Sequence, residues 1–403
     1  MSDEQGSRFD HEILEAISRT RVFSGGKRHH ELVAPLLPEG YQWIDVTVPL
    51  TDVFDKYRQA DEPIFVFASG DPLFFGYTTT LMREFPGLVQ KTYPYFNSLQ
   101  LLCHALTLPY HDMRVCSLTG RPWHEFDRAL IERTPKLGVL TDRKNTPGLI
   151  AQRMLDYGYD KYRMHIGVRL GGEREELYSL PLSEVATREF EQPNCLIIEA
   201  TEPLEYAAPL GLPEGDFHLL NGRAKMITKM PIRLLSLSML ELHRRRYLWD
   251  VGFCTGSVSV EAKLQFPHLH VRSFEIREEG AELMPANSRR FGTPGITYHI
   301  GDFMEVDISE YERPEAVFIG GHGGKMNDFV HKIVGHIAEG GVIVFNSVSE
   351  ETLDLFRSAI AEVGWHIHSE MRIALDAHNP ITILQAKALP EPSAEAGDSS
   401  TLS

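Results

Sequence analysis

The sequence predicts an α/β protein with two domains, and three observations support this prediction. The chain has 403 residues, and domains of about 150 residues imply more than one folding unit. Short β-rich segments alternate with helical segments in both halves, a pattern typical of largely parallel sheets. The Pro- and Gly-rich segment 201–215 has neither period and indicates a linker. We therefore expect domains at 1–205 and 206–389, followed by a disordered tail at 390–403.

In the first half, the expected strands are separated by turns and helices. Strands are expected at 42–48, 63–69, 137–140, 180–182 and 195–199, and helices after Gly76 and Ser98. The turn formed by Gly70, Asp71 and Pro72 follows the second of these strands. The Asp71 carboxylate can cap the next helix or contact a cofactor.

The second half has a more regular alternation of strand and helix. Strands are expected at 247–251, 271–274, 296–299, 316–319, 342–345, 365–373 and 381–384, with helices at 278–291 and after Met326 and Glu350. This order predicts one doubly wound domain, whose ligands bind at the carboxyl ends of the strands.

Composition and charge exclude several classes of protein. Forty basic against 56 acidic residues give a net charge of −16, which argues against a protein that coats nucleic acid or anionic lipid. No apolar segment approaches the roughly 18 to 20 residues that span a bilayer, and the acidic first residues do not resemble a secretory signal. The four cysteines are far apart and indicate neither a disulfide framework nor a zinc site. We expect a cytoplasmic protein with no metal, nucleic-acid or membrane partner.

The strongest local signal is the segment 248–257, where a strand leads into a turn of small residues and then a helix. Gly252 and Gly256 would allow the backbone to approach a ligand closely. The helix start at Thr255 and Ser257 would offer free amides, and Asp250 ends the strand before the turn. Ordinary tight turns would also explain the glycines.

The spacing of two carboxylates favours a nucleoside cofactor. Glu275 ends the next strand, 23 residues after Gly252, close to the spacing at which a carboxylate meets a ribose. Asp302 follows a third strand and would face the adenine side. The pyrophosphate fingerprint of nicotinamide enzymes is absent, and S-adenosylmethionine, which has no pyrophosphate, suits this turn better.

Motifs in both halves resemble enzymes of cobalamin biosynthesis. Segments that resemble the decarboxylating C15-methyltransferases lie at 226–229, 233–240, 250–261, 318–324 and 340–346. Segments that resemble the C5-methyltransferases of the tetrapyrrole methylase class lie at 24–29, 68–76, 117–122, 140–148 and 170–172. Fused in this order, over roughly residues 11 to 388, they are similar to the precorrin-6Y C5,15-methyltransferase (decarboxylating) family.

The resemblance implies an α/β tetrapyrrole-methylase-like first domain that lacks its usual first strand, and a Rossmann-like class I methyltransferase second domain. Each would bind one S-adenosylmethionine and methylate a meso carbon of a precorrin, and the second would also decarboxylate the ring C acetate. The implied cofactor contacts are Gly70 and Asp71 in the first domain, and Thr228, Asp250, Gly252, Thr255, Gly256, Ser257, Glu275 and Asp302 in the second.

A protein that binds a substrate with many carboxylates needs basic side chains to pair with them and a loop that borders the substrate ring. We expect Lys229 and Arg233 to bind it, together with Gly321 and Gly323 after the 316–319 strand. Between these glycines, His322 would bind a substrate carboxylate or accept the meso proton, or is simply tolerated. The run 27–30, Lys-Arg-His-His, lacks a second ligand group at metal-ligand spacing and is interpreted as a surface turn.

Two alternatives stay open. Tyr95 stands where the family has glycine and would crowd the first cofactor crevice. Together with the absent first strand, it favours a protein in which only the second domain is catalytic and the first is a binding or oligomerisation module. A nucleic-acid methyltransferase is the third hypothesis, against which the charge of −16 weighs. We further expect a homo-oligomer.

Overall fold

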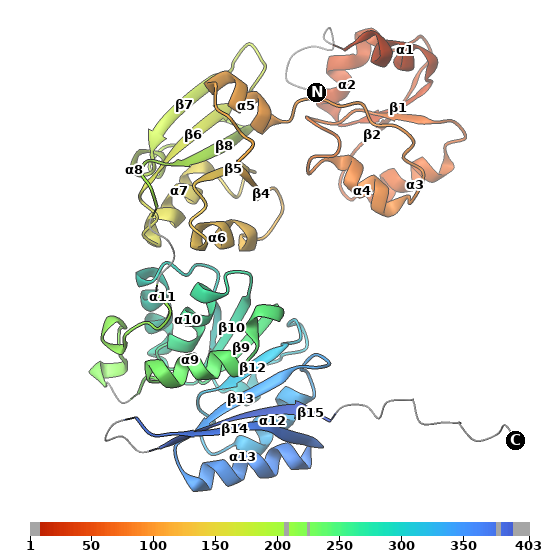
Figure 1. Ribbon diagram of the computed structural model, residues 1–403. Coiled ribbons are helices and arrows are strands. Elements are labelled where there is room, and N and C mark those ends of the chain that lie inside the picture. The colour runs from red at the N-terminus through yellow and green to blue at the C-terminus, as the bar shows by residue number, and fades with distance from the viewer. Residues whose placement is uncertain (1–8, 205–208, 224–225, 376–379, 390–403) are drawn as a thin grey trace, which may run out of the picture. The chain divides into compact units, whose positions relative to one another are not determined.

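The computed structural model describes residues 9–204, 209–223, 226–375 and 380–389, which form two compact units (Figure 1). Unit 1 comprises Met1–Pro122, Thr134–Leu155 and Asp160–Leu204, and unit 2 comprises Trp123–Arg133, Asp156–Tyr159 and Glu205–Ser403. The tail expected at 390–403 lies outside the described residues. No helix in the described ranges is long and apolar enough to cross a membrane.

The first part of unit 1 is a small parallel sheet with strand order β2-β1-β3. Its strands are β1 (Val22–Gly25), β2 (Gln42–Asp45) and β3 (Ile64–Val66), and its helices are α1 (His11–Arg19), α2 (Lys27–Val33), η2 (Ala34–Leu36), α3 (Thr51–Gln59) and α4 (Tyr77–Glu84). The central strand β1 was not predicted, because its four residues are too few to show a period. Phe23 of β1 is fully buried against Ile17 and Phe67 in the core of this part. Among the described strands, β3 pairs only with β1 and forms one edge.

The second part of unit 1 is a mixed sheet of order β4-β5-β8-β6-β7. Its strands are β4 (Arg114–Ser117), β5 (Lys136–Leu140), β6 (Tyr162–Val168), β7 (Glu176–Pro181) and β8 (Asn194–Ala200), with α5 (Ser98–Leu106), α7 (Pro147–Asp156) and α8 (Leu182–Val185). The strand predicted at 180–182 is wrong at Leu182, which begins α8 and is buried. Helix α5 packs on this sheet through Leu99, Leu102 and Cys103, which lie three and four residues apart on one helix face.

Unit 2 contains the expected doubly wound sheet, with strand order β11-β10-β9-β12-β13-β15-β14. Its strands are β9 (Tyr247–Val251), β10 (His270–Glu275), β11 (Thr297–Ile300), β12 (Ala316–Ile319), β13 (Val342–Ser347), β14 (Trp365–Ile373) and β15 (Ile381–Ala388). Its helices are α6 (His124–Ile131), η3 (Glu214–Asp216), η4 (Leu220–Gly222), α9 (Met230–Met239), η5 (Leu242–Arg244), α10 (Ser257–Gln265), α11 (Gly280–Arg290), η6 (Phe303–Glu305), α12 (Met326–Val334) and α13 (Glu350–Glu362). The first five strands are parallel, whereas β15 is antiparallel to both β13 and β14.

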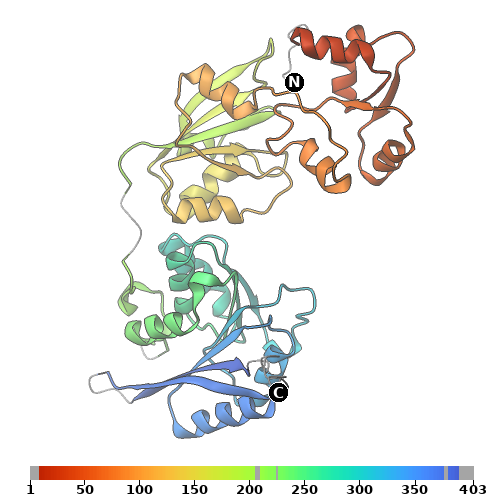
Figure 2. The ribbon, with the colours of Figure 1, turned by 45° about the vertical axis from the view of Figure 1, so that its right-hand side comes forward.

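Alternate residues of the buried strands supply the two cores of unit 2. Leu248 and Phe318 pack on the face covered by α9 and α10, whereas Trp249 and Val317 pack on the face covered by α12 and α13. Figure 2 shows helices on both faces of this sheet. Burial on both faces explains why these strands are continuous hydrophobic segments in the sequence.

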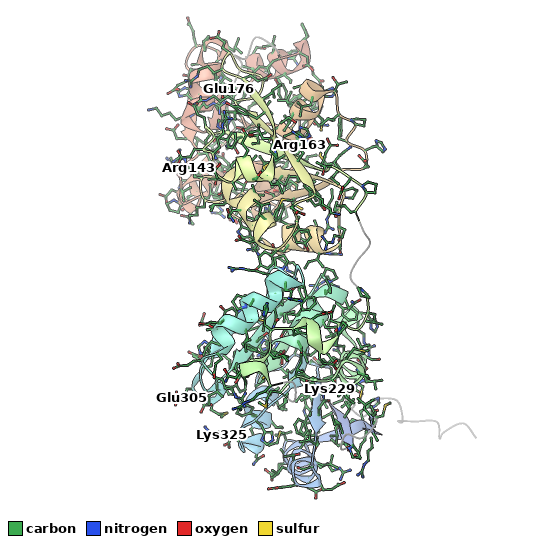
Figure 3. The ribbon with its side chains drawn as sticks, turned by 90° about the vertical axis from the view of Figure 1, so that its left-hand side faces the viewer. Arg143, Arg163, Glu176, Lys229, Glu305 and Lys325 are labelled. Atoms are coloured by element: carbon green, nitrogen blue, oxygen red, sulfur yellow. The ribbon has the colours of Figure 1, made fainter. Side chains whose placement is uncertain are left out.

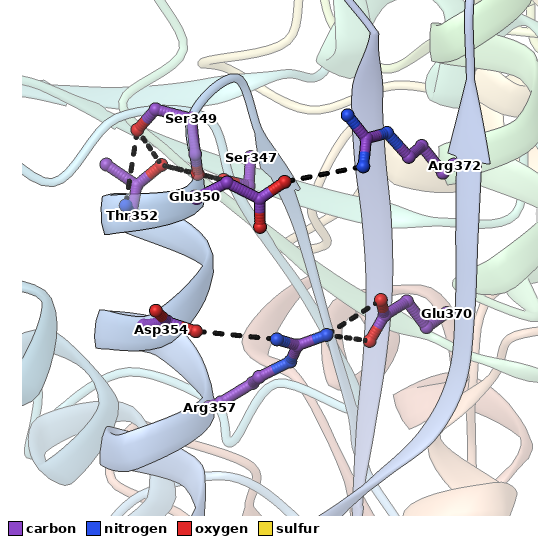
Figure 4. Close-up of polar contacts among 8 residues, drawn as sticks. All are labelled: Ser347, Ser349, Glu350, Thr352, Asp354, Arg357, Glu370 and Arg372. Atoms are coloured by element: carbon purple, nitrogen blue, oxygen red, sulfur yellow. Dashed lines mark hydrogen bonds and ion pairs between the residues drawn. The ribbon is translucent and has the colours of Figure 1, made fainter.

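Helix α13 is also attached to β14 by polar contacts on the surface (Figure 4). Ser349 caps its start and accepts a hydrogen bond from the Thr352 amide at 3.2 Å. Both Glu370 oxygens accept bonds of 2.8 Å from Arg357 Nη2. Exposed ion pairs contribute about 0 to 1 kcal/mol each, so the buried face of the helix provides most of its stability.

Arg233, expected to bind substrate, is fully buried instead, and that expectation is wrong. Its Nε is 2.9 Å from Glu261 Oε2, its Nη1 donates to the Thr228 carbonyl at 2.8 Å, and its Nη2 donates to the Leu212 carbonyl. Glu261 also accepts from the amides of Gly211 at 2.8 Å and Leu212 at 3.0 Å. The pair joins α9, α10 and the end of the predicted linker, which is therefore anchored at 211–212.

Replacing Arg233 by alanine should destabilise unit 2 strongly, because Glu261 would be left buried without a counter-charge. We expect a loss of about 3 to 5 kcal/mol in the free energy of unfolding, measured by urea denaturation. Arg357→Ala, which removes an exposed ion pair of the same unit, is the control and should cost no more than about 1 kcal/mol. Equal losses in the two variants would contradict the structural role of Arg233.

Candidate functional site

The carboxyl ends of four neighbouring strands of unit 2 meet at one edge of the sheet. Val251 pairs with Phe274 and Ile319, and Ile319 pairs with Phe345. The residues that follow these positions are Glu275, Gly252, Gly320 and Asn346, which the sheet therefore aligns along one edge. Gly252, Gly320 and Asn346 lie within the motif segments of the sequence analysis, and Glu275 was selected by its spacing. This is the edge at which α/β sheets bind ligands.

Gly252 is required by a close approach of two backbone segments. Its φ is +81°, and a Cβ at this position would lie 2.5 Å from the Gly321 nitrogen. A Cβ at Gly320 would similarly lie 2.7 Å from the Gly252 oxygen. The turn after β9 and the loop after β12 therefore touch through their backbones, and any side chain would separate them.

The turn after β9 continues with two more left-handed residues. Cys254 has φ +53° and Gly256 has φ +75°, after which α10 begins at Ser257. A Cβ at Gly256 would lie 2.7 Å from Met284 Sδ. Thr255 is 1% exposed, and its Oγ1 has no hydrogen-bond partner among the described residues. Such a buried, unpaired hydroxyl beside a helix start fits a polar ligand.

Glu275 lies at the end of β10, as predicted, but its carboxylate already has partners. Its Oε2 accepts the Cys254 amide at 2.7 Å, and its Oε1 accepts the Arg277 amide and the Arg277 guanidinium, both at 3.0 Å. The carboxylate therefore holds the turn after β9 in place. Two carboxylate oxygens offer about four lone pairs, so capacity remains for a ribose hydroxyl.

Asp250 lies beneath the turn rather than on its surface. It is fully buried, and its Oδ2 accepts a 2.6 Å bond from Ser259 on α10. Burial, with a smaller contribution from the charge of Glu275, raises the pKa of Asp250 to about 7. Its Oδ1 has no partner in the described part of the chain.

Asp302 connects two loops at the same end of unit 2. Its Oδ1 accepts the Met304 amide at 2.9 Å, and its Oδ2 is 2.7 Å from Lys325 Nζ. The hydrogen bond from Lys325 is the main reason that the pKa of Asp302 is lowered. Lys325 was not predicted as a site residue, although it directly follows the glycine-rich loop 320–324. Figure 3 marks Lys325 and Lys229 on unit 2.

Two polar side chains near this edge contain buried nitrogens that have no partner among the described residues: His322 Nδ1 and Asn346 Nδ2. The His322 ring meets Phe345 edge-on, with 5.9 Å between centroids, and burial lowers its pKa. The Asn346 amide is oriented by Ser236, which donates to its Oδ1 at 3.0 Å. Asn346 was not predicted as a site residue, although it ends the motif segment 340–346.

The remaining predicted site residues of unit 2, the substrate residues Gly321, Gly323 and Lys229 and the cofactor residue Thr228, lie on two segments. A Cβ at Gly321 or Gly323 would meet no atom within 4 Å, so both glycines border open space. Lys229 precedes α9 and is half-buried, as is Thr228, whose carbonyl is bound by Arg233. The roles of these four residues stay predictions.

Unit 1 contains a cavity of about 260 Å³. Its lining residues are Arg28, Ser69, Gly70, Asp71, Phe74, Phe75, Gly76, Phe96, Asn97, Ser98, Leu101, Leu140, Gly167, Leu170, Pro193, Asn194 and Cys195. The predicted Gly70 and Asp71 are among them, and Asp71 Oδ1 accepts the Leu73 amide at 2.9 Å. Burial raises the pKa of Cys195 to about 12, which keeps the thiol protonated and unsuited to nucleophilic attack.

Two predictions for this cavity are wrong. Tyr95 is not one of the lining residues, because the chain presents its neighbours Phe96 and Asn97 instead, so the expected crowding is not seen. The 27–30 run is not a surface turn, because it begins helix α2, Arg28 lines the cavity, and His29 bonds the lining residue Ser69 at 2.9 Å.

Comparisons with known proteins agree with both halves. Residues 221–388 match the family model described as a precorrin methyltransferase domain. Over 372 residues, 92% of this chain and 88% of the relative, the chain is 29% identical to precorrin-6Y C(5,15)-methyltransferase [decarboxylating] of a Sinorhizobium species.

Two single-function relatives from Salmonella typhimurium match separate parts of the chain. Cobalt-precorrin-6B C(15)-methyltransferase (decarboxylating) is 37% identical over 145 residues, 36% of this chain and 74% of the relative. Cobalt-precorrin-7 C(5)-methyltransferase is 32% identical over 174 residues, 43% of this chain and 83% of the relative. The chain therefore belongs to the precorrin-6Y C5,15-methyltransferase (decarboxylating) family, with a tetrapyrrole-methylase-like first domain and a class I methyltransferase second domain.

Proposed function

We propose that this chain methylates a precorrin at C5 and C15 and decarboxylates its ring C acetate, using S-adenosylmethionine, in cobalamin biosynthesis. We assign the C5 reaction to residues 1–205 and the C15 reaction with decarboxylation to residues 206–389. The observation that supports two reactions is that each unit has a place for ligands: the cavity of unit 1 and the carboxyl edge of unit 2. The match over 88% of the fused relative agrees with this assignment.

The proposed chemistry depends on positioning. S-adenosylmethionine supplies an electrophilic methyl group, and the meso carbon of a reduced tetrapyrrole is electron-rich. The residues of the chain must therefore align the two and exclude water. A nucleophilic side chain is not required, in agreement with the protonated thiol of Cys195.

In unit 2, the turn after β9 fits this cofactor. Its unpaired Thr255 hydroxyl offers a polar group to a ligand, and the close backbone approach at Gly252 holds the turn against the loop after β12, where Gly321 and Gly323 border open space. The residues proposed to hold it are Thr228, Gly252, Thr255, Gly256, Ser257, Glu275 and Asp302, with Asp250 supporting the turn from below.

The loop after β12 is proposed to face the substrate, with Gly321 and Gly323 bordering its ring. The lowered pKa of His322 keeps the imidazole neutral at pH 7, the form able to accept a proton or a hydrogen bond. Lys229 would pair with a substrate carboxylate. In unit 1, we assign cofactor contacts to Gly70 and Asp71.

One observation favours the alternative in which only unit 2 is catalytic. Strand β3 has a single partner among the described strands, so the sheet beside the unit 1 cavity has an open edge. We also propose that the protein acts in the cytoplasm as a homo-oligomer, which size-exclusion chromatography with light scattering would test.

Counting methyl groups distinguishes the two functions. The purified chain, incubated with precorrin-6Y and labelled S-adenosylmethionine, should add two methyl groups and release one carbon dioxide per substrate, measured by mass spectrometry. One methyl group with loss of carbon dioxide would instead establish the unit 2-only alternative.

Glu275→Gln should weaken one of two cofactor sites per chain, because it removes the charge offered to the ribose. We expect the binding free energy of S-adenosylmethionine at that site to weaken by about 1.5 to 3 kcal/mol, measured by titration calorimetry. Glu282→Gln, on the exposed face of α11, is the matched control and should bind as the unaltered chain does. Unchanged affinity in Glu275→Gln would exclude Glu275 from the site.

Lys229→Gln should raise the precorrin KM for C15 methylation and reduce its dependence on salt, because one charge that attracts the substrate is lost. Lys229→Arg keeps the charge and should retain most of the salt dependence. Cofactor affinity should stay near normal in both variants. Equal losses for precorrin and cofactor would contradict a substrate role.

A further inference from the structure

The start of helix α2 (Lys27–Val33) contributes Arg28 to the lining of the unit 1 cavity and is held in a defined position. The Gly26 amide donates to His29 Nδ1 at 3.3 Å, so the ring proton is on Nε2. That Nε2 lies 2.9 Å from Ser69 Oγ, to which it donates. Burial lowers the pKa of His29 to about 4, so the ring is neutral at pH 7 and this hydrogen-bond arrangement persists. The start of α2 is therefore attached to the segment after β3, and Arg28 lines the cavity.

Aromatic side chains form much of another wall. Phe74, Phe75 and Phe96 line the cavity, and Phe75 and Phe96 remain 41% and 52% exposed. Phe75 also adopts the left-handed backbone conformation, with φ +51°, which is uncommon for an aromatic residue. The Arg121 guanidinium lies over one face of the Phe75 ring, 5.2 Å from its centroid, and the exposed parts of Phe75 and Phe96 provide a surface on which a flat conjugated ring can pack.

The charges at the cavity favour an anion near Arg28. Arg28 and Asp71 are its charged lining residues, and Asp71 uses an oxygen to accept the Leu73 amide. Burial, and after it the charge of Arg169, lower the pKa of Arg28. Arg169 itself is 2.8 Å from Glu191. Arg28 is exposed and already makes contacts within the chain, and its planar fork of donors can bind a carboxylate in addition to them.

We propose that Arg28 binds a side-chain carboxylate of the tetrapyrrole in unit 1 while its ring packs on Phe75 and Phe96. His29 acts as a positioning residue through Ser69. This inference rests on the proposed function of unit 1. The carboxylate of S-adenosylmethionine offers the same chemistry, so the experiment must separate the two sources.

The two reactions of one chain provide an internal control. In the full chain, Arg28→Gln should raise the precorrin KM for C5 methylation roughly 10- to 100-fold, as for the loss of a charge-assisted hydrogen bond. C15 methylation and decarboxylation should be unchanged. Arg28→Lys should give an intermediate KM, since it keeps the charge without the planar fork. Lys27 is the exposed residue next to Arg28 at the start of α2. Lys27→Gln is therefore the matched control and should leave both reactions unchanged. Calorimetry should show normal S-adenosylmethionine binding in all three variants.

Three results would overturn the proposal. Weakened cofactor binding in Arg28→Gln would assign the carboxylate to S-adenosylmethionine. An equal effect in Lys27→Gln would indicate that any positive charge at the start of α2 attracts the substrate, without a specific contact from Arg28. A lower kcat for C5 methylation with unchanged KM would indicate a structural role.

Absence of C5 methylation in the unaltered chain would refute the proposed function of unit 1. In that case a binding measurement, which needs no C5 activity, tests the role of Arg28. Fluorescence titration with uroporphyrin, a porphyrin octacarboxylate, should give tighter, salt-sensitive binding to the unaltered chain than to Arg28→Gln. Identical titrations of the two proteins would overturn the proposal.

Discussion

The site of unit 2 depends on one constraint: the backbone of the turn after β9 touches the backbone of the loop after β12. A Cβ at Gly252 would lie 2.5 Å from the Gly321 nitrogen, well inside van der Waals contact. Because of this contact, the two loops at the carboxyl edge of the sheet form one surface. Glu275 stabilises the same turn from the neighbouring strand by accepting the Cys254 amide. Residues that come from separate strands are therefore brought together at one edge of the sheet.

Buried charge organises the structure around this surface. The Arg233–Glu261 pair fastens α9, α10 and residues 211–212, and its geometry satisfies both charges with backbone partners. In contrast, the exposed pairs of α13 with β14 connect elements that hydrophobic burial already holds. Arg233, which precedes β9 in the sequence, is thus a fold residue here, whereas a substrate role for the neighbouring Lys229 stays a proposal.

Unit 1 uses different means to shape its cavity. Glycines at 70 and 76 allow a tight turn after β3, and a Cβ at Gly76 would lie 2.6 Å from the Pro72 oxygen. The His29–Ser69 bond attaches the start of α2 to it, so that a cation and two exposed aromatic rings border the same space. Both units therefore provide preorganised surfaces, which is what methyl transfer to an electron-rich carbon requires of a protein.

The sequence by itself determined the fold class, the doubly wound second domain, the family and the glycine turn at 252–256. These depend on local periodicity and on spacing along the chain, which a single sequence displays. Only the tertiary structure decided that Arg233 is a buried partner of Glu261, that Tyr95 does not line the unit 1 cavity, and that Arg28 does. Each of these depends on the direction of a side chain relative to segments distant in sequence, such as Arg28 beside the segment after β3. Charge and size alone do not distinguish a cation that binds substrate from one that holds helices together.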